Sequence, residues 1–169
     1  MDKNEVIDLL ERNGKVLFDL LEGAGPKFAA WKPSAGGWSP LEVACHLLDE
    51  EREDFRSRIR LTLEDPRKDW PGIDPERWVT ERSYAGRELG EVIEELRRER
   101  ASSVAWLRST PLDLDVAHAH PQLGRLRVGD LLASWAAHDL LHLRQLTRLQ
   151  YQWLEELAKP HSVVYAGRW

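Results

Sequence analysis

The sequence predicts an all-α fold, a four-helix bundle with long crossover loops in one domain that spans residues 1–169. Four long segments repeat their apolar residues with the 3.6-residue period of an amphipathic helix. Two long connections, residues 64–86 and 109–127, are typical of bundles whose chain crosses from one end to the other. The sequence contains no internal repeat, low-complexity tract or glycine-rich phosphate loop that would indicate another architecture.

The composition is that of an ordinary soluble protein and excludes several classes. Of the 169 residues, 42% are hydrophobic and 31% are charged, which allows a substantial core. A formal net charge of −5 without a basic patch argues against nucleic acid as a partner. No apolar run approaches the roughly 20 residues that span a membrane. Cys45 is the single cysteine and the N-terminus lacks the apolar stretch of a signal peptide, so we expect a cytoplasmic protein.

The first helix is expected to begin at Asp2, which has the spacing of a capping box with Glu5. Leucine and valine residues then follow a helical period until a segment rich in glycine and proline ends the helix. The connector over residues 24–38 contains Trp31 and Trp38. Two tryptophans in a short connector indicate that it packs across the bundle.

The second helix has the clearest start in the chain, at Ser39. Pro40 suits the first helical turn, and Glu42 completes the Ser-x-x-Glu pattern of a capping box. Its apolar stripe continues to Leu63, which predicts one continuous helix. Cys45 lies on that stripe and is interpreted as a small core residue.

The third helix is expected over about 88–108, and its apolar stripe contains a charged residue, Arg100. An unpaired buried guanidinium is costly. Asp139 falls on the apolar stripe of the fourth helix, so the two side chains can be partners inside the bundle. The alternative is that Arg100 extends along its aliphatic stem to reach solvent.

The fourth helix is expected from about Val128 past Leu149, with Pro160 as its limit. It carries His138 and His142, whose spacing places them roughly 40° apart around the helix and about one turn apart along it. Both imidazoles can therefore reach one ion, as they do in other His-x-x-x-His helices. A fortuitous i,i+4 pair is the alternative.

Other histidines have weaker signals. His46, in the second helix, shares a polar flank with Glu50 and can be a surface residue. His118 and His120, in the connection over 109–127, are interpreted as loop or turn residues. An extended backbone at that point would instead allow both to bind one metal ion.

Two segments together resemble the DinB/YfiT-like superfamily of metalloenzymes: WSPLEVACHL at 38–47 and WAAHDLLHLRQ at 135–145. Glu81–Tyr84 and His120–Gly124 are similar to the connectors of that family, so the resemblance covers nearly the whole chain. It implies a four-helix bundle with down-up-up-down connectivity. It also implies a divalent metal ion held by three histidines, which match His46, His138 and His142.

Three neutral imidazoles leave a fourth coordination position for water or substrate, the pattern of catalytic rather than structural zinc. Zinc and nickel both suit imidazole ligands. Glu50 lies one turn after His46, so it is the candidate for the group that takes a proton from a bound water. The alternative places Glu50 in the solvated charged run over residues 49–54.

The resemblance implies a metal-dependent enzyme that acts on a small-molecule substrate, as a hydrolase or as a transferase that uses a low-molecular-weight thiol. The alternative is a non-catalytic, stress-associated metal-binding bundle that works through dimerisation. We expect a homodimer, mainly from the resemblance. A second reason is that eight tryptophans offer apolar area that one bundle need not bury. The other interpretation is that all the tryptophans anchor the core or the loops.

Overall fold

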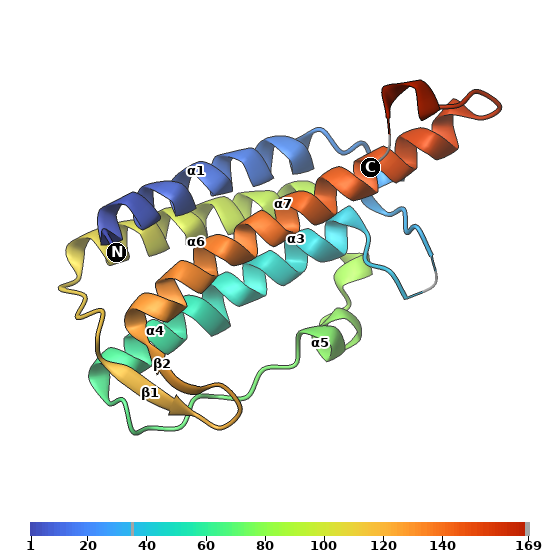
Figure 1. Ribbon diagram of the computed structural model, residues 1–169. Helices are drawn as coiled ribbons and strands as arrows, with labels where there is room; N and C mark the ends of the chain where they lie inside the picture. Colours follow the sequence, from blue (N-terminus) through green and yellow to red (C-terminus); the bar gives the residue numbers. More distant parts are fainter. Residues whose placement is uncertain (35, 168–169) are drawn as a thin grey trace.

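The computed structural model describes residues 1–34 and 36–167, and it shows four long helical rods packed side by side (Figure 1). Three rods are single helices, and the fourth joins two helices through a π-helical turn. The single helices are α1 (Lys3–Glu22), α6 (Leu89–Ser109) and α7 (Val128–Ala158). The fourth, the α3–α4 rod, consists of α3 (Pro40–Asp49), the π-turn (Glu50–Asp54) and α4 (Phe55–Glu64). The predicted four-helix bundle is confirmed.

Each rod packs against one parallel and one antiparallel neighbour (Figure 1). The α1 and α3–α4 rods each pack against both α6 and α7, so they lie diagonally across the bundle from each other. In Figure 1, α1 and α7 run from left to right, whereas the α3–α4 rod and α6 run from right to left. The segment after α4 returns along the outside of the bundle through α5 (Pro75–Glu81) and a 3₁₀ turn (Tyr84–Gly86) before α6 begins.

Side-chain caps set two of the helix starts that the sequence indicated. Ser39 Oγ accepts a hydrogen bond from Glu42 N at 3.3 Å, and Glu42 Oε2 accepts one from Ser39 N at 2.8 Å. These two bonds form the predicted capping box. Asp2 caps α1 through the backbone N–H of Asn4. The connector between α1 and α3 contains a short helix, α2 (Pro26–Ala29), that the sequence analysis did not predict.

The expectation of one continuous α-helix from Ser39 to Leu63 is wrong at its centre. The π-turn, Glu50–Asp54, interrupts the rod, and the N–H of Phe55 bonds to the carbonyl of Glu50, five residues earlier. A π-turn widens the helix locally and changes which side chains face inward. Glu50, Glu51 and Asp54 are consequently all buried, although the local sequence is almost entirely charged.

The connection over residues 109–127 contains a β-hairpin instead of an irregular loop. Strand β1 (Ala117–His120) pairs antiparallel with β2 (Gly124–Arg127), so that Ala117 faces Arg127 and His120 faces Gly124. Gly124 has a φ of +71°, a conformation that glycine adopts without steric cost. Strands of four residues are at the lower limit at which period-two alternation indicates a strand.

The apolar core is divided into two clusters along the bundle. One contains Leu17, Leu48, Leu96 and Leu146, and the other contains Ile7, Leu10, Leu107, Leu132 and Trp135. On α6 and α7, buried polar residues lie in sequence between the members of the two clusters, among them Arg100, Asp139 and His142. The candidate site therefore lies in a polar layer at mid-height of the bundle.

The tryptophans do not provide the exposed apolar area that was expected of them. Every tryptophan in the described part of the chain is buried or half-buried, and Trp169 lies outside that part. Trp31 and Trp38 pack against Trp153 and His46, as expected for a connector that crosses the bundle. The homodimer stays a prediction. No helix within residues 1–34 and 36–167 combines the length and the apolar character that membrane crossing requires.

Candidate metal centre

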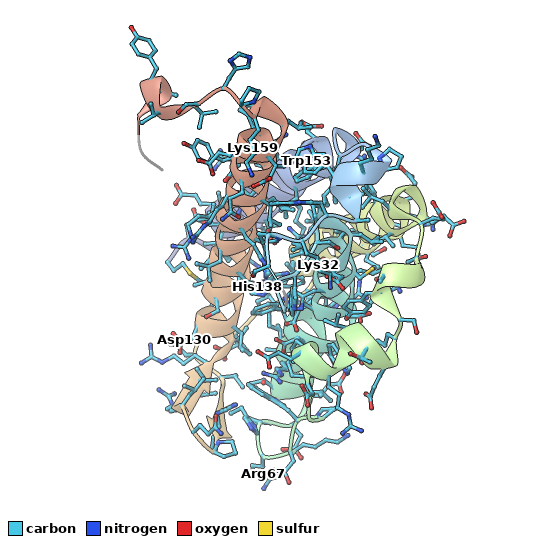
Figure 2. The ribbon with its side chains drawn as sticks, turned by 90° about the vertical axis from the view of Figure 1, so that its right-hand side faces the viewer. Lys32, Arg67, Asp130, His138, Trp153 and Lys159 are labelled. Carbon is cyan, nitrogen blue, oxygen red and sulfur yellow. The ribbon has the colours of Figure 1, made fainter. Side chains whose placement is uncertain are left out.

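Three histidine side chains from two rods converge in the polar layer. Nε2 of His138 lies 3.3 Å from Nε2 of His46 and 3.1 Å from Nε2 of His142. One possible ligand atom from each of the three lies within 4.8 Å of the others. In Figure 2, His138 lies between α7 and the α3–α4 rod. Among the described residues, no other group of three or more histidine, cysteine or acidic side chains is arranged to hold a metal ion.

Two elements position the three imidazoles. The regular turn of α7 brings the rings of His138 and His142 to a centroid distance of 4.4 Å. The His46 ring, on α3, lies 4.8 Å from the His142 ring and is covered on another side by Trp38, also at 4.8 Å. The interpretation of His46 as a surface residue is wrong, because only 5% of the residue is exposed. The side of α3 that carries His46 looks like a polar flank in the isolated helix, but α7 and the connector with Trp38 cover it.

The site favours neutral imidazoles. Burial, followed by the neighbouring histidines, lowers the pKa of His46 to about 3. Burial, followed by His142 and Arg100, lowers the pKa of His138 to about 3. Burial also lowers the pKa of His142. Because a neutral imidazole is the form that binds a metal ion, the ring nitrogens are ready for coordination at neutral pH.

Outer contacts fix the orientation of two rings. Nδ1 of His142 lies 2.8 Å from Oε1 of Gln145, an oxygen that can only accept, so Nδ1 carries the proton and the lone pair of Nε2 faces the other histidines. Nδ1 of His46 lies 3.8 Å from Oε1 of Glu50, which is too long for a hydrogen bond. Gln145 was not among the predicted site residues, although its position three residues after His142 on a helix was a usable signal.

Glu50 does not belong to a solvated charged run. Glu50 is 4% exposed, and Glu51 and Asp54 are also buried, so that alternative is wrong. Burial, followed by a hydrogen bond with Asp54, raises the pKa of Glu50 to about 8, while Arg58 opposes the change. Asp54 is in turn paired with Arg58, with Oδ1 and Nε 2.5 Å apart. Glu50 thus lies inside the polar layer, beside His46.

Arg100 also lies in this layer and does not extend to solvent. Its guanidinium contacts Asp139 on α7, Glu51 on the π-turn and the carbonyl oxygen of Leu10 on α1. Burial by itself would lower the pKa of Arg100, but Glu51 and Asp139 raise it above its ordinary value. The predicted partnership between Arg100 and Asp139 is present, with Glu51 as a second partner.

His118 and His120 do not join the cluster. They lie on strand β1, so the backbone is extended, yet each is engaged locally. Nδ1 of His118 lies 3.0 Å from the carbonyl oxygen of Pro66, and its ring stacks on Trp70 at 4.1 Å. Nδ1 of His120 accepts hydrogen bonds from two backbone N–H groups of the hairpin turn. These histidines stabilise the hairpin and its contact with the neighbouring connection.

Comparison with known proteins identifies the family. The family model of the DinB superfamily matches residues 9–146. The chain belongs to the DinB superfamily. The matched range includes His46, His138 and His142.

One relative and two solved structures extend the comparison. A protein of Oceanobacillus iheyensis, named as a candidate metal-dependent hydrolase, is 26% identical over 122 residues, which cover 68% of this chain and 66% of the relative. YfiT from Bacillus subtilis superposes with a TM-score of 0.79 at 20% identity, covering 89% of this chain and 86% of YfiT. YfiT is described as a probable metal-dependent hydrolase with an unusual four-helix bundle topology. TT2238, a four-helix bundle protein, superposes with a TM-score of 0.57 at 24% identity, covering 86% of this chain and 98% of TT2238.

Proposed function

We propose that His46, His138 and His142 bind one divalent metal ion and that the protein is a metal-dependent hydrolase of a small-molecule substrate. The observation that carries this proposal is the spacing of the three Nε2 atoms, with the two closest pairs 3.1 and 3.3 Å apart. Two nitrogens that bind zinc tetrahedrally at about 2.0–2.1 Å lie about 3.3 Å from each other. Two of the three N···N separations therefore match the edge of a zinc coordination tetrahedron.

The donor set supports the same conclusion. The three imidazoles cannot all satisfy one another by hydrogen bonds, because Nε2 of His138 takes part in both N···N contacts and carries either one proton or one lone pair. The proton of the His142 ring is already directed to Gln145. A cation at the centre would satisfy the remaining lone pairs. Imidazole nitrogens suit zinc and nickel, so we propose one of these two metals.

The relatives support hydrolysis as the reaction class. Both the protein of Oceanobacillus iheyensis and YfiT carry names that describe metal-dependent hydrolases. An ion with three protein ligands and an open position acidifies water and polarises a carbonyl or phosphoryl oxygen. The rings of Trp38 and Phe55 flank the histidines at centroid distances of 4.8 and 5.2 Å, and they keep bulk water from that side of the site.

The assignment of a proton acceptor is a separate part of the proposal. Glu50 is the candidate from the sequence. Its carboxyl group lies beside Nδ1 of His46, whereas Nε2 of the same ring faces His138. Its role as a general base stays a prediction. Cys45 is unsuited to act as a nucleophile because burial raises the pKa of its thiol to about 12. Thiol-dependent transfer would therefore need an external low-molecular-weight thiol.

Metal content tests the proposal directly. The purified protein, reconstituted with zinc or nickel and dialysed, is expected to retain one ion per chain by elemental analysis, and His142→Ala is expected to retain none. His161→Ala is the matched control, because His161 is exposed after the end of α7. Bound metal should also raise the melting temperature, since a ligand at 100 times its dissociation constant stabilises the fold by about 2.7 kcal/mol.

A substrate screen tests the reaction class. Wild type loaded with metal should hydrolyse at least one class among small amides, esters and phosphoesters, and His142→Ala should be inactive towards it. A parallel screen with low-molecular-weight thiols tests the transferase alternative. Wild-type protein that retains no metal after reconstitution would contradict the metal centre, and bound metal without turnover in either screen would favour the non-catalytic alternative.

A further inference from the structure

Two buried polar atoms face each other without a hydrogen bond beside the candidate metal centre. Nδ1 of His46 and Oε1 of Glu50 lie 3.8 Å apart. Neither atom has a hydrogen-bond partner among the residues that the structure describes, and both are inaccessible to solvent. Buried side-chain polar atoms nearly always have a partner, so this pair needs an explanation.

The chemistry of a metal-bound imidazole supplies the explanation, and this step rests on the proposed function. An ion on Nε2 uses the lone pair of that atom, so the ring proton must then reside on Nδ1. A buried N–H donor without an acceptor is costly. Oε1 of Glu50 lies 3.8 Å from that nitrogen, and closing the gap by less than 1 Å would give an ordinary N–H···O bond.

The Glu50 carboxyl is itself held in place from the far side. The Glu50 carboxyl hydrogen-bonds to Asp54, and Oδ1 of Asp54 lies 2.5 Å from Nε of Arg58. The guanidinium of Arg58 lies 4.9 Å from the ring centre of Trp70 in the connection after α4. His46, Glu50, Asp54 and Arg58 recur at every fourth residue, so one line of side chains runs from α3 through the π-turn to α4.

We propose that Glu50 is a positioning residue that accepts a hydrogen bond from Nδ1 of His46 and so aims Nε2 of His46 at the metal ion. Gln145 has the same relation to His142, with a contact of 2.8 Å to Nδ1. Two ligands from two rods are thus each oriented by an oxygen acceptor on their own helix. This role requires an oxygen at Oε1 and does not require Glu50 to take a proton from the substrate or from water.

Zinc affinity separates this role from a purely structural one. We compare wild type with Glu50→Met, which removes the acceptor, and with Glu50→Gln, which keeps a carbonyl oxygen at the same place. Loss of an outer-shell partner of a metal-binding histidine typically weakens metal affinity about 10- to 100-fold. That loss is expected for Glu50→Met by competition with a chelator, while Glu50→Gln should bind zinc nearly as well as wild type. Glu53→Met is the matched control, since Glu53 is on the same π-turn with 45% of its side chain exposed.

A measurement on the wild type keeps the proposal testable if Glu50→Met does not fold. In zinc-loaded protein with ¹⁵N-labelled histidine, the Nδ1–H of His46 should appear as an imidazole proton protected from exchange with solvent. Cobalt(II) absorption then reports whether the variants keep the wild-type coordination geometry.

The outcomes are distinct. Wild-type zinc affinity in a folded Glu50→Met, or an unprotected Nδ1–H of His46, would overturn the positioning role and leave the metal centre standing. If Glu50→Gln bound zinc as weakly as Glu50→Met, the role of Oε1 as a simple acceptor would be overturned. A wild type that binds no zinc would overturn this inference together with the proposed function.

Discussion

Arg100 on α6 and Asp139 on α7 form a two-pronged ion pair at the centre of the bundle. Nη1 of Arg100 lies 2.6 Å from Oδ2 of Asp139, and Nη2 lies 2.9 Å from Oδ1. Nε of the same guanidinium lies 3.0 Å from Oε2 of Glu51, and Nη1 donates to the carbonyl of Leu10. One side chain therefore connects all four rods at the height of the three histidines. Asp139 lies between His138 and His142 in the sequence, so the pair also restrains the helix that carries them.

Arg100→Ala is expected to destabilise the protein by about 3–5 kcal/mol, because removing one partner leaves buried carboxylates without compensation. The free energy of unfolding, measured by denaturant titration of the metal-free protein, checks this. Arg97→Ala is the matched control on the same helix, since Arg97 is 42% exposed in its ion pair with Glu22 and such pairs contribute little. An unchanged denaturation midpoint in Arg100→Ala would contradict the role of the ion pair.

The metal-free protein is expected to lose stability as the pH falls from about 6.5 towards 3. The pKa of both His46 and His138 is lowered from 6.5 to about 3 in the fold, so between these values the unfolded chain binds more protons than the folded chain. The contribution of the two histidines to the free energy of unfolding is complete above their pKa in the unfolded chain. It is lost as the pH falls towards their pKa in the folded protein. Because carboxylates also titrate in this range, the comparison with a variant isolates the histidines.

His138→Gln should therefore show a shallower decrease in the free energy of unfolding than wild type over the same pH range, in the presence of a chelator. His161→Gln should follow wild type because His161 is exposed. Parallel pH profiles for His138→Gln and wild type would show that the buried imidazoles are not the origin of the decrease.

Turnover of Glu50→Gln distinguishes positioning from general-base catalysis, once a substrate has been found. Glutamine cannot act as a base, and loss of a general base typically lowers the rate about 10²- to 10⁴-fold. The contact of Glu50 with His46 leads us to expect that Glu50→Gln keeps zinc and most of kcat, whereas Glu50→Met loses zinc affinity. A variant Glu50→Gln that binds zinc normally but turns over at least about 100-fold more slowly would restore the base role.

A homodimer is expected in solution from the family resemblance. With the tryptophans covered, α7 still presents exposed apolar area, because Leu140, Leu141, Leu154 and Leu157 are each about half exposed or more. Light scattering at micromolar concentration should give twice the 19.5 kDa mass of the chain. The mass of a single chain under those conditions would exclude the dimer.

Local interactions explain why the sequence alone determined the four long helical segments and the start at Ser39. A capping box such as Ser39 with Glu42 involves residues three apart, and an amphipathic period is visible within one segment. The pairing of His138 with His142 is equally local, because one turn of a single helix brings them together. These features depend on the backbone of one element and need no knowledge of its neighbours.

The tertiary structure decided which polar flanks face inward. His46 and His138 are 92 residues apart in sequence and approach to 3.3 Å because α3 packs near α7, a contact that no local pattern contains. The burial of Glu50 depends on a π-turn inside a helix whose composition indicates a solvated surface. Helical periodicity specifies on which side of its helix a side chain lies. Whether that side faces protein or water depends on the other three rods. The sequence could therefore place each candidate ligand on its helix, and only the packing of the rods could bring the three together.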